Sequence, residues 1–329
     1  NFDPAGSAER PRLAVVDGGV YATWTERNPG TSRYQVRVAR WNGSTTSPAW
    51  TFVDGNQANG LNRDPAQDAD APVLAEVLDN LYLAFYEADG FGIWQIRVRR
   101  FAVGTSTWTW LDGGGATGRN FNPAEPAWQP EVCGQSAALV LTWTEYSGGV
   151  QHVRLAAYDV FDSEWTWLDG GTSNGLNVDP TRDAYASTVC GYQQSYSRVM
   201  VAWVEVNGQG VATVRASSGT SAGSFYSITP TTSLNFDDTR PASSPHLVAL
   251  GARPYLAFGE TIANRKQLRV AALGSSTNEF PGNATSPLNQ DSALDARAGR
   301  LYSSGYQVFA VWAEENSSGV YQIRIAKTQ

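Results

Sequence analysis

The sequence has few of the residues on which metal and acid–base chemistry usually depend: two histidines, two cysteines and one methionine in 329 residues. His152 and His246 have no metal-ligand spacing, which argues against a histidine-based zinc site. Lys and Arg number 24 against 31 Asp and Glu, so no nucleic-acid partner is expected. No run of about 20 apolar residues occurs, so no membrane insertion is expected. Nucleophile-elbow, P-loop and dinucleotide motifs are also missing.

What the sequence does contain is an internal repeat. An Asn followed two residues later by Asp or Asn recurs six times, with a mean spacing of 57.6 residues. The six asparagines are Asn1, Asn62, Asn120, Asn177, Asn235 and Asn289. An alanine stands seven residues after each of them. Each unit then holds runs in which apolar and polar residues alternate with the period of two that is typical of half-buried strands.

This repetition predicts an all-β fold, a six-bladed β-propeller of four-stranded antiparallel blades forming one domain over residues 1–329. The predicted repeat units are 1–61, 62–119, 120–176, 177–234, 235–288 and 289–329. Aromatic residues at equivalent positions are expected to pack between blades, namely Trp24, Phe85, Trp143, Trp203, Phe258 and Trp312.

The last repeat unit is predicted to lack its fourth strand, because only four residues follow Ile325. Three explanations stay open: a three-stranded blade, a strand from residues lost before Asn1, or a strand from a neighbouring chain. An unpaired strand edge favours association, so the sequence predicts self-association through this blade.

Cys133 and Cys190 occupy matching positions in adjacent repeats, 57 residues apart. They are a candidate structural disulfide if both lie near the propeller axis, and two buried thiols otherwise. Paired cysteines, low lysine content and abundant tryptophan together indicate a secreted or cell-surface protein. No signal peptide is visible, which is consistent with its removal.

Several polar residues repeat in every unit. Each second strand ends in a glutamate, and each third strand contains an arginine. A feature present in all units favours a structural staple between Glu and Arg over a ring of catalytic carboxylates. The Asn-x-Asp signature is likewise interpreted as a turn staple, with Ca²⁺ binding as the alternative. No cofactor is otherwise expected.

Positions that differ between units are better candidates for a binding site. Residues five and eight positions after each signature Asn enter the innermost strand and are expected to line the channel mouth. The predicted ligand-binding residues are Trp128, Tyr185, Arg182, Arg240, Arg297, Glu9 and Asp70. Aromatic rings beside mixed charge suit a sugar or small polar ligand. The alternative is that these residues are merely solvated at the rim.

Four repeated elements carry a family resemblance: Leu-Asn-x-Asp-Pro, Pro-x-Leu-Ala, Trp-x-Glu and Gln-Ile-Arg-Val, seen at 61–65, 72–75, 143–145 and 95–98. They resemble repeats of secreted prokaryotic six-bladed β-propellers, which are often labelled sialidase-like. The resemblance covers the whole chain and implies the fold. Sialidases carry Asp boxes of the form Ser-x-Asp-x-Gly-x-x-Trp, which this sequence lacks, so the resemblance assigns no catalytic residue.

The leading functional expectation is therefore a non-catalytic extracellular propeller, lectin-like or adhesive, that binds a glycan or protein through one face. One alternative is a sialidase-like glycoside hydrolase with carboxylates at the channel mouth, for which Glu9, Asp70 and Glu125 are the candidates. Another alternative is a structural subunit of a surface assembly, completed by a strand from elsewhere.

Overall fold

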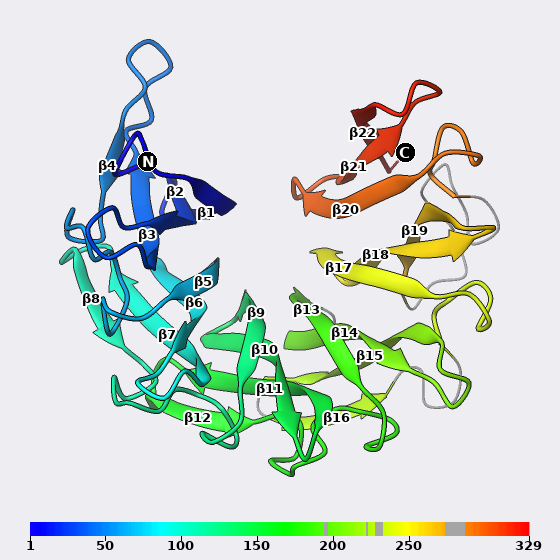
Figure 1. The fold of residues 1–329 in the computed structure, drawn as a ribbon, viewed down its shortest axis with the longest axis horizontal. Coiled ribbons are helices and arrows are strands. Elements are labelled where there is room, and N and C mark those ends of the chain that lie inside the picture. Colours follow the sequence, from blue (N-terminus) through cyan, green and yellow to red (C-terminus); the bar gives the residue numbers. More distant parts are fainter. Residues whose placement is uncertain (194–196, 222, 228–232, 274–286, 329) are drawn as a thin grey trace. The chain divides into compact units, whose positions relative to one another are not determined.

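The computed structural model describes residues 1–193, 197–221, 223–227, 233–273 and 287–328. Their regular secondary structure consists of β-strands in six antiparallel sheets, and these residues contain no helix (Figure 1). Each sheet is a meander in which consecutive strands pair. The predicted fold class, an all-β propeller with six blades, is confirmed.

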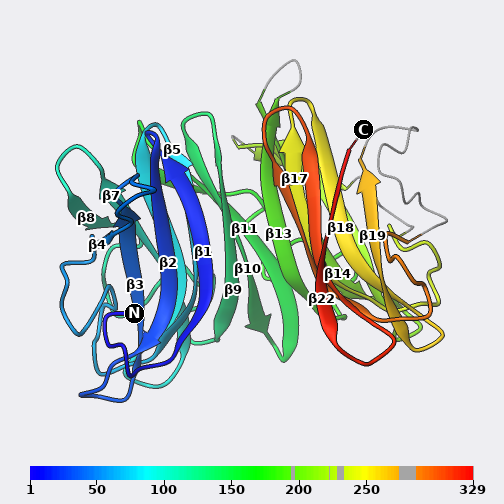
Figure 2. The same cartoon turned by 90° about the horizontal axis from the view of Figure 1, so that it is seen from above.

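The chain consists of two compact units. Unit 1 comprises residues 1–149 and 158–165, and unit 2 comprises residues 150–157 and 166–329. The first three sheets contain β1 (Ala8–Val16), β2 (Gly19–Arg27), β3 (Tyr34–Trp41), β4 (Trp50–Phe52), β5 (Ala69–Val77), β6 (Asn80–Ala88), β7 (Trp94–Ala102), β8 (Thr107–Trp110), β9 (Ala127–Gln135), β10 (Ala138–Ser147), β11 (Val150–Asp159) and β12 (Glu164–Trp167). Figure 2 shows β1, β2 and β3 of the first sheet running alongside one another.

The fourth to sixth sheets belong to unit 2. They contain β13 (Ala184–Gln193), β14 (Ser197–Val206), β15 (Ala212–Thr220), β16 (Gly223–Ser227), β17 (Ala242–Leu250), β18 (Arg253–Ile262), β19 (Arg265–Ala272), β20 (Ala296–Ser303), β21 (Val308–Glu315) and β22 (Tyr321–Lys327). Within the described residues the fifth and sixth sheets have three strands each, so the sixth blade lacks a fourth strand as predicted.

Five of the six repeated aromatic residues lie in the apolar interior, as the sequence predicts, whereas Trp24 is half-buried. Trp143, Trp203 and Phe85 are fully buried, and Phe258 and Trp312 are nearly so. The indole N–H groups of the tryptophans do not remain unpaired there. Trp203 Nε1 donates to Glu205 at 3.0 Å, and Trp312 Nε1 donates to Glu314 at 2.9 Å.

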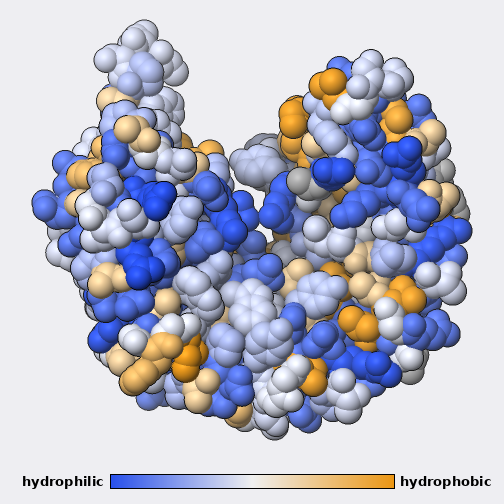
Figure 3. Space-filling view, in the orientation of Figure 1, coloured by the Kyte–Doolittle hydropathy of each residue, from blue (hydrophilic) through white to orange (hydrophobic). Residues whose placement is uncertain are grey.

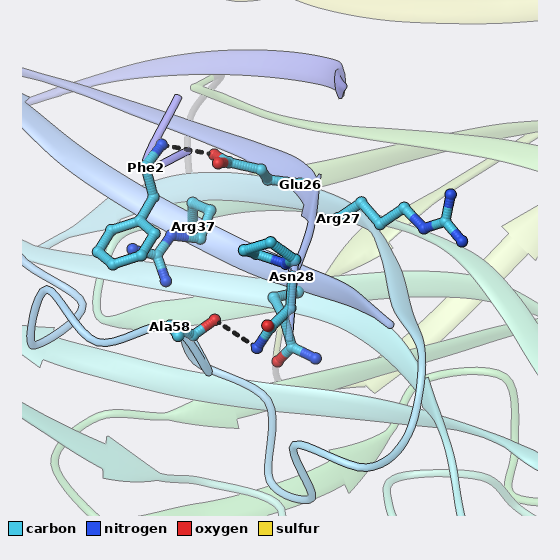
Figure 4. Close-up of a pocket in the computed structure, with 8 residues that line it drawn as sticks. Phe2, Glu26, Arg27, Asn28, Arg37 and Ala58 are labelled. Carbon is cyan, nitrogen blue, oxygen red and sulfur yellow. Dashed lines mark hydrogen bonds between the residues drawn. The ribbon is translucent and has the colours of Figure 1, made fainter. Parts of the chain in front are cut away.

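The repeated glutamate holds the signature turn. In the first blade the backbone N–H of Phe2 donates to one carboxylate oxygen of Glu26 at 2.8 Å (Figure 4), and that of Asp3 donates to the other at 2.6 Å. Glu87, Glu145, Glu205 and Glu314 accept the same pair of N–H groups in their blades, and Glu260 accepts one of them. The cavity beside Glu26 is about 10 Å³, room for one water at most, so this turn is structural rather than a ligand site.

The repeated arginine has a partner that the sequence analysis missed. Arg37 Nε lies 3.1 Å from Asp54, and Arg154 Nε lies 2.9 Å from Asp169, with all four side chains buried. These aspartates stand two residues after the last residue of the fourth strand of their blades. The predicted contact with the glutamate is present for Arg269, whose Nε lies 2.9 Å from Glu260, and for Arg97, whose Nε lies 3.8 Å from Glu87. Arg97 also lies 3.5 Å from Asp112 after the fourth strand. The arginine therefore joins the third strand to the segment after the fourth strand, to the second strand, or to both.

The signature asparagine connects adjacent blades. The side-chain amide of Asn62 accepts from the N–H of Val36 at 3.0 Å and donates to the carbonyls of Tyr34 and Gln67, both at 3.0 Å. Asn120, Asn177, Asn235 and Asn289 repeat these three contacts. The predicted turn staple is confirmed, and it also links the third strand of one blade to the entrance of the next.

The aspartate of the signature offers a pH test in the fourth blade. Asp179 Oδ1 accepts from the Thr181 hydroxyl at 2.7 Å and from the Thr181 N–H at 3.0 Å, and these bonds lower the pKa of Asp179 below its ordinary value of 3.8. The contribution to folding is present above the ordinary pKa and is lost as the pH falls through the lowered one. Thr181→Ala should raise the pKa of Asp179 toward 3.8, measured by NMR titration of the carboxyl carbon.

The matched control is Thr239→Ala, which removes the same hydroxyl contact from Asp237 in the fifth blade. It should raise the pKa of Asp237 and leave that of Asp179 unchanged. An unchanged Asp179 titration in Thr181→Ala would show that the hydroxyl bond does not set this pKa.

A β-bulge recurs near the start of every first strand of a blade. The register shifts between Glu9 and Arg12 in β1 and between Asp70 and Val73 in β5, and the other four blades do the same. In five blades a non-glycine bulge residue has a φ of 49° to 54°: Arg10, Ala71, Gln129, Ala186 and Ser244. Bulges bend a strand and redirect side chains, so this one sets where the variable residues point.

Candidate functional site

The first strands of the three blades in unit 1 lie next to one another, β1 against β5 and β5 against β9 (Figure 1). We call the surface formed by β1, β5 and β9 the inner-strand surface. It carries residues from the variable positions, and its centre is Asp70 on β5.

Four donors converge on the Asp70 carboxylate. Arg10 Nη1 lies 2.7 Å from Oδ2, and the Tyr86 hydroxyl donates to the same oxygen at 3.0 Å. The Thr25 hydroxyl donates to Oδ1 at 3.0 Å, and the N–H of Ala71 donates to Oδ1 at 2.6 Å. These four contacts fix the orientation of the carboxylate group. Asp70 keeps 24% of its side-chain surface exposed, so this carboxylate lies at a surface that a ligand can reach.

Tyr86 is a hydrogen-bond donor in this cluster rather than a phenolate. Burial, and after it the charge of Asp70, raises the pKa of the Tyr86 phenol. Its ring packs edge-on against Trp94, with centroids 5.0 Å apart. Arg10 Nη1 also approaches the Tyr86 oxygen at 3.4 Å. The arginine, the phenol and the carboxylate therefore form one connected network.

Further charges surround Asp70 on the inner-strand surface. Glu9 is exposed on β1 and pairs in register with Thr25, whose hydroxyl reaches Asp70. Arg12 on β1 lies 3.8 Å from Glu131 on β9. Opposed residues of an antiparallel pair have Cβ atoms about 5 Å apart, which places Glu9 in the neighbourhood of Asp70. The inner-strand surface thus carries the Asp70 carboxylate, held by four donors, near the exposed carboxyl group of Glu9.

The other predicted residues of unit 1 are placed differently. Trp128 on β9 is half-buried, and its ring packs on Tyr146 with centroids 5.0 Å apart. Glu125 lies in the turn before β9, where its N–H donates to the Asn122 carbonyl. Trp128 and the predicted neighbouring ring, Tyr185, belong to different units, so the aromatic platform they were expected to share stays a prediction.

In unit 2 the predicted arginines do not converge on one carboxylate within the described residues. Arg182 Nε lies 4.0 Å from Asp179, and Arg240 Nε lies 3.1 Å from Asp237, each within its own signature turn. Arg297 on β20 differs, because it lines a cavity of about 120 Å³ that also contacts Ser243 on β17. Burial raises the pKa of the half-buried Tyr185 phenol on β13.

The two cysteines of the predicted disulfide belong to different units. Cys133 lies on β9 in unit 1, and Cys190 lies on β13 in unit 2. The disulfide therefore stays a prediction. In the described part of the chain no group of three or more His, Cys, Asp or Glu side chains could hold a metal ion, and no helix is long and apolar enough to cross a membrane.

Arg10, Thr25 and Tyr86 were absent from the residues predicted from the sequence. Thr25 and Tyr86 occupy the middle position of the aromatic-x-Glu element, which pairs in register with the variable residue of the first strand. This position differs between blades just as the variable positions do, so it could have been found. Arg10 is positioned by the bulge in β1, which no sequence pattern predicts.

The chain is similar to known proteins at the level of the fold. No family model and no curated protein matches the chain. Among solved structures, a Trypanosoma rangeli sialidase with the inhibitor DANA is similar at 11% identity and a TM-score of 0.53, over 98% of this chain and 55% of that one. A GH93 α-L-arabinofuranosidase of Fusarium graminearum with arabinobiose has 12% identity and a TM-score of 0.52, over 98% of this chain and 93% of that one. A Hadza microbial sialidase has 12% identity and a TM-score of 0.56, over 98% of this chain and 66% of that one.

At such low identity these likenesses define the class of fold, a six-bladed propeller of the sialidase and GH93 type. They also correct the leading expectation of a non-catalytic binding or adhesion propeller. The similar structures carry the names of glycosidases, so that expectation was wrong, and the glycoside hydrolase alternative is the better supported one. The sequence kept the hydrolase only as an alternative, because nothing in the spacing of Glu9, Asp70 and Glu125 singles out a pair of carboxylates.

Proposed function

We propose that the chain is a glycoside hydrolase whose reaction takes place on the inner-strand surface of unit 1. The observation that carries this proposal is the Asp70 carboxylate, partly exposed and held by Arg10, Thr25 and Tyr86. This cluster is asymmetric: the positions equivalent to Asp70 hold Glu9, Trp128, Tyr185, Ser243 and Arg297 in the other blades. A scaffold contact would repeat, whereas a catalytic group needs to occur once.

Glycoside hydrolysis commonly requires two carboxyl groups. One protonates the oxygen of the leaving sugar, and the other attacks the anomeric carbon or deprotonates the attacking water. We assign the second role to Asp70, because four donors hold its carboxylate oxygens in place at an accessible surface. Glu9 is assigned the role of proton donor, since it is exposed beside Asp70. Arg10 and Tyr86 orient the Asp70 carboxylate.

The proposal is tested by incubating the purified protein with a panel of polysaccharides and of 4-nitrophenyl glycosides that includes sialosides and arabinofuranosides. We expect release of reducing sugar or nitrophenol from at least one member, and loss of that release in Asp70→Asn. Activity that persists undiminished in Asp70→Asn would remove Asp70 from the reaction, and inactivity toward every member would overturn the hydrolase itself.

A location outside the cytoplasm fits this function, because polysaccharides are extracellular. The low lysine content, the twelve tryptophans and the two cysteines support secretion or display at the cell surface. A glycan is the proposed partner.

Association with a further strand is proposed for β22, the outer strand of the sixth sheet. Ile323 and Ile325 on β22 are 71% and 67% exposed, and orange patches appear in Figure 3 where Figure 1 draws β20 to β22. Arg324 has a buried Nε and no carboxylate within ion-pair distance among the described residues, whereas the equivalent Arg37 and Arg154 each pair with an aspartate after the fourth strand. The proposed partner of β22 is therefore a strand that is followed by an aspartate, which pairs with Arg324.

The peptide Ser-Thr-Trp-Thr-Trp-Leu-Asp-Gly, copied from residues 106–113, should bind this edge. Replacing its Asp by Asn should weaken binding about tenfold, because a hydrogen-bonded charge is then lost. The same replacement should have no effect on binding to Arg324→Met. Equal binding of both peptides to the unmodified protein would exclude the proposed contact with Arg324, and fluorescence anisotropy measures all four combinations.

A further inference from the structure

Unit 2 contains a cavity between its fifth and sixth blades that the proposed hydrolase does not use. Its volume is about 120 Å³. The residues that line it come from four strands of these two blades: Ser243, Ser244, Gly259, Lys266, Leu268, Ala296, Arg297 and Gly299. Apart from Leu268, the side chains are small, hydroxyl-bearing or cationic, which is an unusual lining for a gap between packed sheets.

One substitution of the repeat leaves space in this cavity. Gly259 is the middle residue of the aromatic-x-Glu element, where unit 1 has Thr25 and Tyr86. It pairs in register with Ser243, and a Cβ at Gly259 would touch the Ser243 hydroxyl at 3.4 Å. Gly299 stands where Pro245 stands in the fifth blade, and a Cβ there would lie 2.2 Å from Leu268 Cδ1, so glycine at this position admits the Leu268 side chain. The space beside Gly259 is therefore a feature of the fifth blade and not of the fold.

The charge around the cavity is positive. Lys266 and Arg297 contribute two cations, and the carboxylate of Asp295 lies 3.6 Å from Arg297. Asp295 also accepts the Lys266 N–H at 2.9 Å, and the Arg297 guanidinium lies over the Tyr321 ring, 4.4 Å from its centroid. Arg297 is thus held in place by Asp295 and Tyr321. The two cations and the one anion give the site a net charge of +1. The hydroxyl groups of Ser243 and Ser244 are additional hydrogen-bond donors at the same site.

We propose that this cavity binds a tetrahedral oxyanion ester carried by a sugar, either a sulfate or a phosphate monoester. Lys266 and Arg297 neutralise its charge, and Ser243 and Ser244 donate hydrogen bonds to it. Donors that come from β17, β19 and β20 suit oxygens that point in several directions, whereas a planar carboxylate has two. The inference goes beyond the proposed hydrolase, and it is tested by binding alone, so its failure leaves the Asp70 proposal untouched.

Isothermal titration calorimetry in 150 mM salt should compare galactose 6-sulfate, galactose 6-phosphate and galactose. We expect one or both esters to bind and galactose to give no heat. Lys266→Gln and Arg297→Gln should each weaken ester binding by about tenfold or more, because each removes a charge-assisted hydrogen bond. Gly259→Val should abolish binding by filling the cavity, and it introduces no strained backbone angle at Gly259.

The matched control is Arg265→Gln. Arg265 precedes Lys266 on β19, pairs with Glu315 at 3.7 Å and is not among the residues that line the cavity. This variant should bind as the unmodified protein does. Binding by one ester alone identifies the source of the oxyanion. Equal binding of galactose, or unchanged affinity in both Lys266→Gln and Arg297→Gln, would overturn the proposal, provided that thermal unfolding shows both variants folded.

Discussion

Replacing Asp70 by asparagine is expected to lower the rate of glycoside hydrolysis by about 10²–10⁴-fold. The amide keeps the size of the carboxyl group and an oxygen that accepts from Thr25 and Ala71. It can neither attack the anomeric carbon nor take a proton from water. The loss should therefore appear in kcat for every substrate that the protein hydrolyses, measured as initial rates at saturating substrate.

Two comparisons separate the chemistry of Asp70 from its structural contacts. Glu76→Gln makes the same isosteric change further along β5, where the exposed Glu76 accepts only the Asp79 N–H among the contacts described for it, and it should leave activity unchanged. Glu9→Gln should slow hydrolysis of alkyl glycosides strongly and of 2,4-dinitrophenyl glycosides weakly, because a good leaving group needs no proton. Asp70→Asn should slow both equally, and a leaving-group dependence in Asp70→Asn would reverse the two roles.

Replacing Trp203 by alanine is expected to reduce the free energy of unfolding by about 3–5 kcal/mol, since it opens a large cavity in the interior. Trp203 on β14 is fully buried, and its indole donates to Glu205, which holds the signature turn of the fourth blade. Alanine therefore removes both the packing and one contact of the glutamate. Urea unfolding followed by intrinsic fluorescence and by circular dichroism measures the change.

Trp203→Phe should cost far less than Trp203→Ala, because phenylalanine occupies the equivalent positions Phe85 and Phe258 in other blades. The remaining loss of stability comes from the smaller ring and from the lost indole hydrogen bond, and the bond contributes about 0.5–1.5 kcal/mol. Trp50→Ala on β4 serves as the control, since Trp50 is 47% exposed. A Trp203→Ala protein as stable as Trp50→Ala would show that this ring does not support the blade.

The repeats made the scaffold predictable, and particular residues show why. Ala, Trp and Glu recur at fixed distances from the signature Asn, so six similar sheets follow from the period of two within each repeat. The turn role of Asn62 and its equivalents was also predictable, because Asn and Asp bind local backbone groups. The pairing of Arg37 with Asp54 was not, since it depends on how the segment after the fourth strand returns to the sheet.

The site was only half predictable. Variation at Asp70 and Arg297 indicated where to look, but the expected cluster of arginines at the channel mouth depended on side chains that turned out to bind their own turns. Arg182 and Arg240 contact Asp179 and Asp237, three residues earlier, because a nearby anion is a better partner than open solvent. The sequence shows where these charged residues stand, but the partner of each side chain depends on the tertiary structure.

The linear order of residues therefore determined that this protein is a six-bladed all-β propeller, because strand period, turn chemistry and repeat length are local properties. The tertiary structure alone decided that Arg10, Thr25, Asp70 and Tyr86 form one network and that Lys266 and Arg297 share a cavity. These residues are distant in sequence or redirected by a bulge. Their contacts arise only when strand register and blade packing bring them within hydrogen-bonding distance.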